Sequence, residues 1–177
     1  MDNEARVAAI REMSEYFRAA TPKAEERIAH TLEVLGNAEQ ILAGEGVDSD
    51  FVTTVAILGA LFHDIGIPES ERKYRSAEPK YQHQEGPPIT RSILAKLSTR
   101  PDVLERVCFI VGNHHSRERI DGMDFQIVYE ADYIVNTAAG ATTQGRPLDL
   151  EALQRTDREH LRTSTALRLI RESRQGQ

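Results

Sequence analysis

The stretch Phe51-Val-Thr-Thr-Val-Ala-Ile-Leu-Gly-Ala-Leu-Phe62 is the most apolar part of the chain, and His63-Asp64-Ile65-Gly66 follows it directly. A helix that crosses a bilayer needs about 20 apolar residues, so this shorter run indicates a helix in the core of a globular protein. Gly66 and Pro68 mark its end. An imidazole and a carboxylate therefore close the most apolar helix, where burial obliges them to find partners.

Helical periodicity extends on both sides of this stretch. Apolar residues recur at three- and four-residue intervals, as they do on the buried face of an α-helix. The clearest examples are Val7, Ile10, Met13 and Phe17, and then Leu32, Leu35, Ala38 and Leu42. Because the alternation typical of strands is scarce, the sequence predicts an all-α helical bundle of about seven helices.

Glycines, prolines and capping residues set the expected helix boundaries. One helix is expected over residues 4–20 and another over about residues 150–172, after a polar linker over residues 140–147. Residues 68–84 lack an apolar stripe and are expected to be irregular, with the next helix starting after Pro87-Pro88. No shift in composition divides the chain, so residues 1–177 are expected to form a single domain.

The charge and the cysteine content restrict the partners that the protein can be expected to bind and the cellular compartment in which it is expected to act. The 22 Lys and Arg residues are outnumbered by 28 Asp and Glu residues, which gives a net charge of −6. A nucleic-acid partner is not expected, because binding a polyanion calls for a basic face. Cys108 is the single cysteine, so neither a disulfide framework nor a Cys-based zinc site is expected. With a charged N-terminus as well, the sequence predicts a cytoplasmic protein that does not bind membranes.

Several histidines and aspartates lie on apolar helix faces rather than on solvated ones. His30 shares a face with Val34, His114 continues the apolar stripe of its helix, and Asp132 lies on the face of Val128. A carboxylate on such a face costs several kcal/mol unless it is paired, protonated or bound to a metal. Convergence on a metal site is a more economical explanation than a buried hydrogen-bond network without metal.

The ligand types restrict the metal. Imidazoles and carboxylates without thiolates suit Fe, Mn, Ni, Co, Zn or Mg, and they do not suit Cu(I) or an iron–sulfur cluster. The sequence therefore predicts one or two divalent metal ions as the cofactor.

The order His30, then His63-Asp64 within Phe-His-Asp-Ile-Gly, then Asp132 resembles the His…His-Asp…Asp signature of the HD-domain metal-dependent phosphohydrolase superfamily. The resemblance covers about residues 25–136, the expected metal-binding core, on which the terminal helices would pack. It implies that these four residues bind one metal ion and that Asp64 also reaches a second. It further implies that His63 and Asp64 belong to the catalytic centre.

Relatives with two metal ions carry additional ligands between the His-Asp pair and the last aspartate. In this chain the interval contains His83, Glu85, His114 and His115. The apolar face favours His114 over His115, whereas the choice between His83 and Glu85 stays open. The number of candidate ligands favours a dinuclear site.

The resemblance implies hydrolysis of a nucleotide or another small phosphoester by metal-activated water. Cations near the ligands would hold the phosphate, and the candidates are Lys73, Lys80, Arg91 and Arg117. Some members have a lysine shortly after the His-Asp pair, where this chain has Ile65-Gly66-Ile67-Pro68.

Two other functions fit the same residues. One is a di-iron oxygenase of the same fold, and the other is a non-catalytic regulatory module that binds metal or nucleotide. His160 lies in a polar segment and is expected at the surface without a role in the site. Whether the protein forms a homo-oligomer is left open by the sequence.

Overall fold

The chain folds into helices, which confirms the predicted all-α class. The computed structural model describes residues 1–140 and 150–175, so all but the first residue of the linker expected over residues 140–147 lies outside the described residues. The helices found there are α1 (Asn3–Ala20), α2 (Ala24–Gly44), α3 (Asp50–Phe62), α4 (Ile67–Tyr74), α5 (Pro79–Lys96), α6 (Pro101–Val111), the 3₁₀ helix η1 (Arg117–Arg119), α7 (Met123–Gly140), α8 (Leu150–His160) and α9 (Ser164–Gln175).

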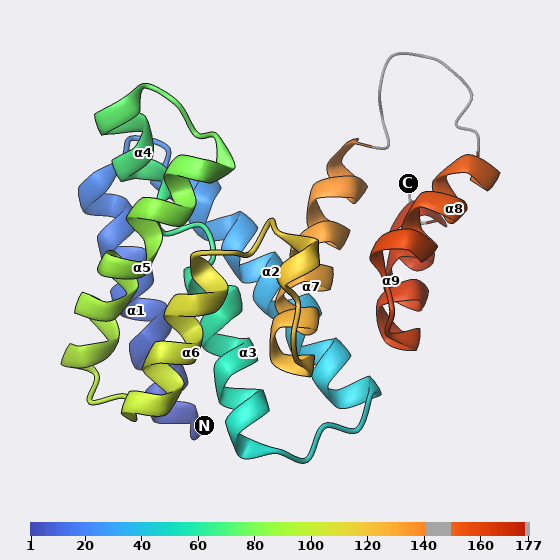
Figure 1. Ribbon diagram of the computed structural model, residues 1–177, viewed down its shortest axis with the longest axis horizontal. Coiled ribbons are helices and arrows are strands. Elements are labelled where there is room, and N and C mark those ends of the chain that lie inside the picture. Colours follow the sequence, from blue (N-terminus) through green and yellow to red (C-terminus); the bar gives the residue numbers. More distant parts are fainter. Residues whose placement is uncertain (141–149, 176–177) are drawn as a thin grey trace.

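Helix α3 is the centre of the bundle, and it packs against α1, α2, α6 and α7 (Figure 1). Every residue from 55 to 62 is buried. Helices α5 and α6 pair on one side, and α9 packs against α2 and α7 on the other. Because α2, α6 and α7 surround α3, side chains at the end of α3 meet side chains from three other helices.

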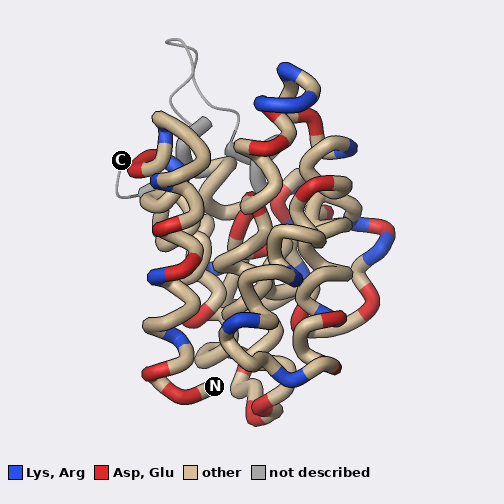
Figure 2. The backbone as a smooth tube through the Cα atoms, turned by 90° about the vertical axis from the view of Figure 1, so that its left-hand side faces the viewer, with Lys and Arg blue, Asp and Glu red and all other residues tan. Residues whose placement is uncertain are grey.

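The segment Asp50–Tyr74 is long and apolar enough to pass for a membrane span, but 72% of its most apolar window is buried inside the protein. That is the arrangement of a core helix in a soluble protein. Figure 2 shows Lys and Arg interspersed with Asp and Glu along the chain.

Residues 68–84 are not irregular, and that prediction was wrong. They contain α4 and the beginning of α5, which starts at Pro79 and continues through Pro87 and Pro88. A proline inside a helix removes one backbone hydrogen bond, which is why the pair was expected at a helix start. Packing of α5 against α4 and α6 outweighs this local loss.

The C-terminal region is also divided differently from the prediction, since α8 and α9 replace one continuous helix. The break is fixed from outside by the buried carboxylate of Glu130 in α7, which accepts hydrogen bonds from the backbone amides of Arg162 and Thr163. Thr163 also caps α9, because its Oγ1 accepts the amide of Ala166 at 3.2 Å. Glu130 lies about 30 residues earlier in the sequence, so the residues around the break do not themselves indicate it.

Two glycines bring the turn after α3 onto the backbone of α5. A Cβ atom at Gly66 would lie 2.6 Å from the carbonyl oxygen of Gln82 and 2.7 Å from the amide nitrogen of Gly86. No larger residue fits at Gly66 without displacing that backbone. The contact sets the part of α5 that carries His83 next to the turn that carries Asp64.

Candidate metal centre

His63 and His114 occupy equivalent positions, each just after the last turn of a helix. His63 Nδ1 lies 2.8 Å from the carbonyl oxygen of Ala60, and His114 Nδ1 lies 2.9 Å from that of Val111. Since a carbonyl oxygen only accepts, Nδ1 carries a proton in both rings. Both rings are buried, at 1% and 2% exposure, and their Nε2 atoms point into the protein. The Nε2 of His114 has no hydrogen-bond partner among the described residues, as expected of a nitrogen arranged to bind a metal.

The first group comprises His30 of α2, His63, Asp132 of α7 and the Oδ2 atom of Asp64. Nε2 of His30 lies 3.3 Å from Nε2 of His63 and 3.3 Å from Oδ1 of Asp132. Oδ2 of Asp64 lies 3.5 Å from His30 and 3.4 Å from His63. Four ligands about 2.1 Å from one ion in a tetrahedral arrangement are about 3.4 Å apart, so this group has the dimensions of a metal site.

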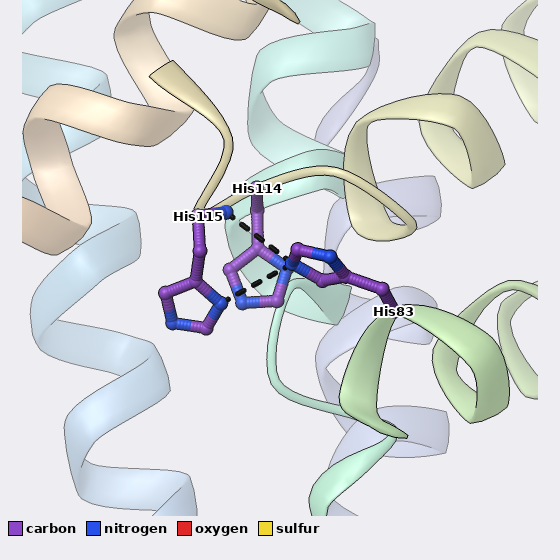
Figure 3. A group of neighbouring side chains, drawn as sticks. All are labelled: His83, His114 and His115. Carbon is purple, nitrogen blue, oxygen red and sulfur yellow. Dashed lines mark hydrogen bonds between the residues drawn. The ribbon is translucent and has the colours of Figure 1, made fainter. Parts of the chain in front are cut away.

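The second group comprises His83 of α5 together with His114 and His115, which follow α6. One ring nitrogen from each lies within 4.8 Å of the other two. Nε2 of His83 is 3.3 Å from Nδ1 of His115, and Figure 3 shows the rings gathered around this contact. The three imidazoles could hold a second ion.

Asp64 lies between the two groups. Its Oδ1 atom is 3.5 Å from Nε2 of His114, while Oδ2 faces His30 and His63 of the first group. Its side chain is 13% exposed, so the carboxylate is directed into the protein. One carboxylate thus presents a different oxygen to each group, as a carboxylate that bridges two ions does.

The pKa shifts of the potential ligands differ between the first and the second group. Burial would lower the pKa of His63, but the carboxylates of Asp64 and Asp132 outweigh it and hold that pKa well above the usual 6.5. For both aspartates burial would raise the pKa, yet the neighbouring histidines hold it below the ordinary value. In the second group, burial and the nearby His114 lower the pKa of His115 to about 4. The pKa of His83 also falls to about 4, for the same two reasons.

Asn136 is a residue of the site that the sequence reasoning did not assign. Its Nδ2 donates to Oδ1 of Asp132 at 2.9 Å, the same oxygen that faces His30 and His63. Such a contact fixes the orientation of a ligand carboxylate. The spacing of four residues on α7 was the available signal, because it places Asn136 one turn beyond Asp132.

Glu85 is the one candidate ligand that the structure places apart from the histidines. Its Oε2 lies 2.6 Å from Nζ of Lys73, and its Oε1 accepts the hydroxyl of Tyr74 at 2.8 Å. Two residues along a helix correspond to about 200° of rotation, so His83 and Glu85 point to opposite sides of α5. In this arrangement Glu85 ties α5 to α4, and His83 joins the second group.

The four cations proposed to hold phosphate are not equivalent. Three of them pair with carboxylates: Lys73 with Glu69 and Glu85, Lys80 with Glu78, and Arg91 with Glu105. Arg117 is exposed, begins η1 and forms no ion pair within the described part of the chain.

His160 is not the free surface residue that the sequence indicated. Its ring stacks on Tyr133 with a centroid separation of 4.7 Å, and its Nδ1 is hydrogen-bonded to the hydroxyl of Tyr129. Both tyrosines belong to α7, so the polar end of α8 packs against the helix that carries Asp132. The polar sequence around His160 gave no sign of this contact.

A family model described as HD domain matches residues 27–162. The fold is similar to a crystal structure of a predicted HD superfamily hydrolase from an uncultured Thermotogales bacterium, with a TM-score of 0.63 and 20% sequence identity over 94% of this chain and 85% of that chain. No curated protein sequence matches significantly. Since the family model covers well over half of the chain, the protein belongs to the HD domain family, the superfamily of metal-dependent hydrolases that the His…His-Asp…Asp order predicted.

Proposed function

We propose that the protein is a metal-dependent phosphohydrolase or phosphodiesterase that acts in the cytoplasm on a small phosphoester, with a nucleotide as the expected substrate. The observation that carries this proposal is the position of Asp64, whose two oxygens face two different groups of potential ligands. Paired metal sites are suited to phosphoester hydrolysis, because both the attacking and the leaving oxygen need electrostatic stabilisation.

The residues fit two divalent ions. His30, His63, Asp64 and Asp132 would hold one, and Asp64, His83, His114 and His115 would hold the other. A bound divalent ion lowers the pKa of water towards neutrality and so supplies a nucleophile at physiological pH. Since the ligands are imidazoles and carboxylates, Fe, Mn, Co, Ni, Zn and Mg are the candidate metals.

The protein's own groups support this assignment. The orphaned Nε2 of His114 is directed at Asp64, and its ring is fixed by the carbonyl of Val111. His83 and His115, with pKa values of about 4, are neutral at pH 7 and can each offer a lone pair. Arg106 pairs with Asp121 and Asp124, so this arginine is not available to a substrate.

The charges of the protein indicate the class of partner that it binds. A small molecule is the proposed substrate, because the net charge is −6 and Lys and Arg are interspersed with Asp and Glu along the chain in Figure 2. We infer neither a membrane nor a nucleic-acid partner.

The test combines metal analysis with turnover. Protein purified without added metal is analysed for Fe, Mn, Co, Ni, Zn and Mg per chain, and the same sample is assayed for phosphate release from a panel of nucleotides and for hydrolysis of bis(p-nitrophenyl) phosphate. Two ions per chain with turnover under nitrogen would support the proposal. Iron with O₂ uptake and no hydrolysis would favour the di-iron oxygenase, to which the thiolate-free ligand set is also suited. Metal with neither activity would favour a regulatory module.

A further inference from the structure

Asn136 connects the first group to the exposed surface of α7. Its Nδ2 donates to Oδ1 of Asp132 at 2.9 Å. That oxygen lies 3.3 Å from Nε2 of His30 and 3.5 Å from Nε2 of His63. Among the residues that the structure describes, no other side chain from outside the two groups donates a hydrogen bond to a member of either group. A direct contact therefore places Asn136 at the metal centre.

The contact also determines which end of the amide faces the site. The carboxylate of Asp132 only accepts hydrogen bonds, so the amide of Asn136 presents its NH2 group to it rather than its carbonyl oxygen. An NH2 group has two hydrogens, and Asp132 accepts one of them. Nδ2 makes no second hydrogen bond within the described part of the chain. One donor thus remains, on a nitrogen atom that is one hydrogen bond away from a potential metal ligand.

Asn136 lies between the buried ligands and the solvent. Asp132, one turn earlier on α7, is 8% exposed. The side chains of His30 and Asp64 are also largely covered, whereas Asn136 is exposed. A molecule that approaches the first group from solvent can therefore reach the free donor of Asn136.

The charge of the loaded site favours an anion. The two groups contain two carboxylates, those of Asp64 and Asp132, so two divalent ions would leave an excess of positive charge. Phosphoryl oxygens accept hydrogen bonds, which matches a free N–H group. The cations Lys73, Lys80 and Arg91 are each paired with a carboxylate instead.

We propose that Asn136 is a substrate-binding residue, which donates its second amide hydrogen to a phosphoryl oxygen while the first holds Asp132. This inference rests on the proposed phosphohydrolase function. A neutral amide suits the position, because a carboxylate there would repel the phosphoryl group and an ammonium group would compete with the metal ion for Asp132. The same donor is available to the charge that develops on the phosphoryl oxygens in the transition state.

The test uses the full chain saturated with Mn²⁺ and compares Asn136→Ala and Asn136→Asp with Thr137→Ala. Thr137 is the matched control, because its hydroxyl lies on the same turn of α7 but donates to the backbone carbonyl of Tyr133 rather than to a potential ligand. Three quantities are measured for each variant: Mn²⁺ per chain, the Kd of inorganic phosphate by calorimetry, and kcat and KM for bis(p-nitrophenyl) phosphate.

At the same Mn²⁺ content as wild type, Asn136→Ala should bind phosphate about 3- to 10-fold more weakly, which corresponds to one hydrogen bond. Its kcat/KM should fall by at least the same factor. Asn136→Asp should bind phosphate more weakly still, because it keeps the shape, loses both donors and repels the anion. Thr137→Ala should stay within about twofold of wild type.

Phosphate affinity equal to wild type in both Asn136 variants, an equal loss in Thr137→Ala, or no phosphate binding by wild type would overturn the inference. So would a loss that only follows lost Mn²⁺, since Asn136 would then act through Asp132 alone. Asn136→Asp keeps the test decisive if Asn136→Ala loses metal, because an added carboxylate attracts the ion. If wild type bound phosphate but hydrolysed no phosphoester, the proposed function would fail, and the phosphate titration alone would still decide the role of Asn136.

Discussion

The Nδ1 atom of His114 lies 2.9 Å from the carbonyl oxygen of Val111, three residues earlier on the same turn. This contact fixes the ring proton on Nδ1 and leaves Nε2 with its lone pair directed at Asp64, 3.5 Å away. His63 makes the same Nδ1 contact with Ala60. At both positions the end of a helix fixes a proton on Nδ1 and sets the direction of the ring, so Nε2 is the nitrogen left for a metal.

Replacement of Asp64 by alanine should remove the residue that both groups share. We expect Asp64→Ala to lower turnover by at least about 100-fold, because changes even in residues that only orient ligands cost 10- to 100-fold. Metal content should fall below two ions per chain, while the far-UV circular dichroism should stay helical. Asp48→Ala, at an exposed position, is the matched control. Full activity with two ions in Asp64→Ala would refute the site.

His83 and Glu85 can be separated by experiment. His83→Ala should reduce the metal content from two ions per chain to one, since His83 belongs to the second group. Glu85→Gln should keep both ions and lower the free energy of unfolding by about 1–2 kcal/mol, because it weakens the contacts to Lys73 and Tyr74. Elemental analysis and urea denaturation measure the two effects. The opposite pattern would assign the ligand role to Glu85.

The residues of the first group were accessible to sequence reasoning because their signals are local. His30 and Asp132 each lie on an apolar face of a strongly periodic helix, and His63 and Asp64 end the most apolar one. The family signature adds their order along the chain. His114 was favoured for the same reason, since its face continues a buried stripe.

The remaining features depend on contacts between distant segments. Whether His83 or Glu85 faces the histidines depends on how α5 is rotated, and the close approach of Gly66 to Gly86 contributes to that rotation. The irregular segment expected over residues 68–84 forms helices because α4 and α5 pack on one another. The pattern of apolar and polar residues along the sequence indicates neither of these two contacts.

Metal binding should release a proton near pH 7. The raised pKa of His63 keeps its ring protonated in the metal-free protein, and a protonated ring cannot bind a metal. His83 and His115, with pKa values of about 4, are already neutral and release none. As pH falls, the protonated form of His63 is favoured, so affinity at the first group should fall. His83 and His115 should not contribute to such a loss until the pH nears 4.

Calorimetry in buffers of different ionisation enthalpy counts these protons. We expect metal binding at pH 7 to release protons in wild type, and the same number in His83→Ala, because His83 is already neutral at that pH. The absence of proton release in wild type would show that His63 is neutral before the metal binds. If fewer protons were released in His83→Ala than in wild type, the released proton would be assigned to the second group.

Glu130 should be a principal stabiliser of the C-terminal region. Its carboxylate is fully buried and accepts four hydrogen bonds: from the side chain of Gln126 at 2.7 Å, from the amides of Arg162 and Thr163, and from the hydroxyl of Thr163 at 2.5 Å. Glutamine has the same shape, and its carbonyl oxygen can still accept hydrogen bonds, but it carries no charge and its NH2 group cannot accept, so at least one of these donors would lose its acceptor. We therefore expect Glu130→Gln to lower the free energy of unfolding by about 2–3 kcal/mol.

Urea denaturation measures this change, with Glu33→Gln at an exposed position of α2 as the control for loss of a charge. Metal content should be unchanged in Glu130→Gln, because none of its four hydrogen bonds involves a residue of either group. If the two variants were equally stable, the break between α8 and α9 would have to be held by other contacts, such as the hydrogen bonds of Glu45 to Ser164 and Thr165. Glu45→Gln would then show the larger loss.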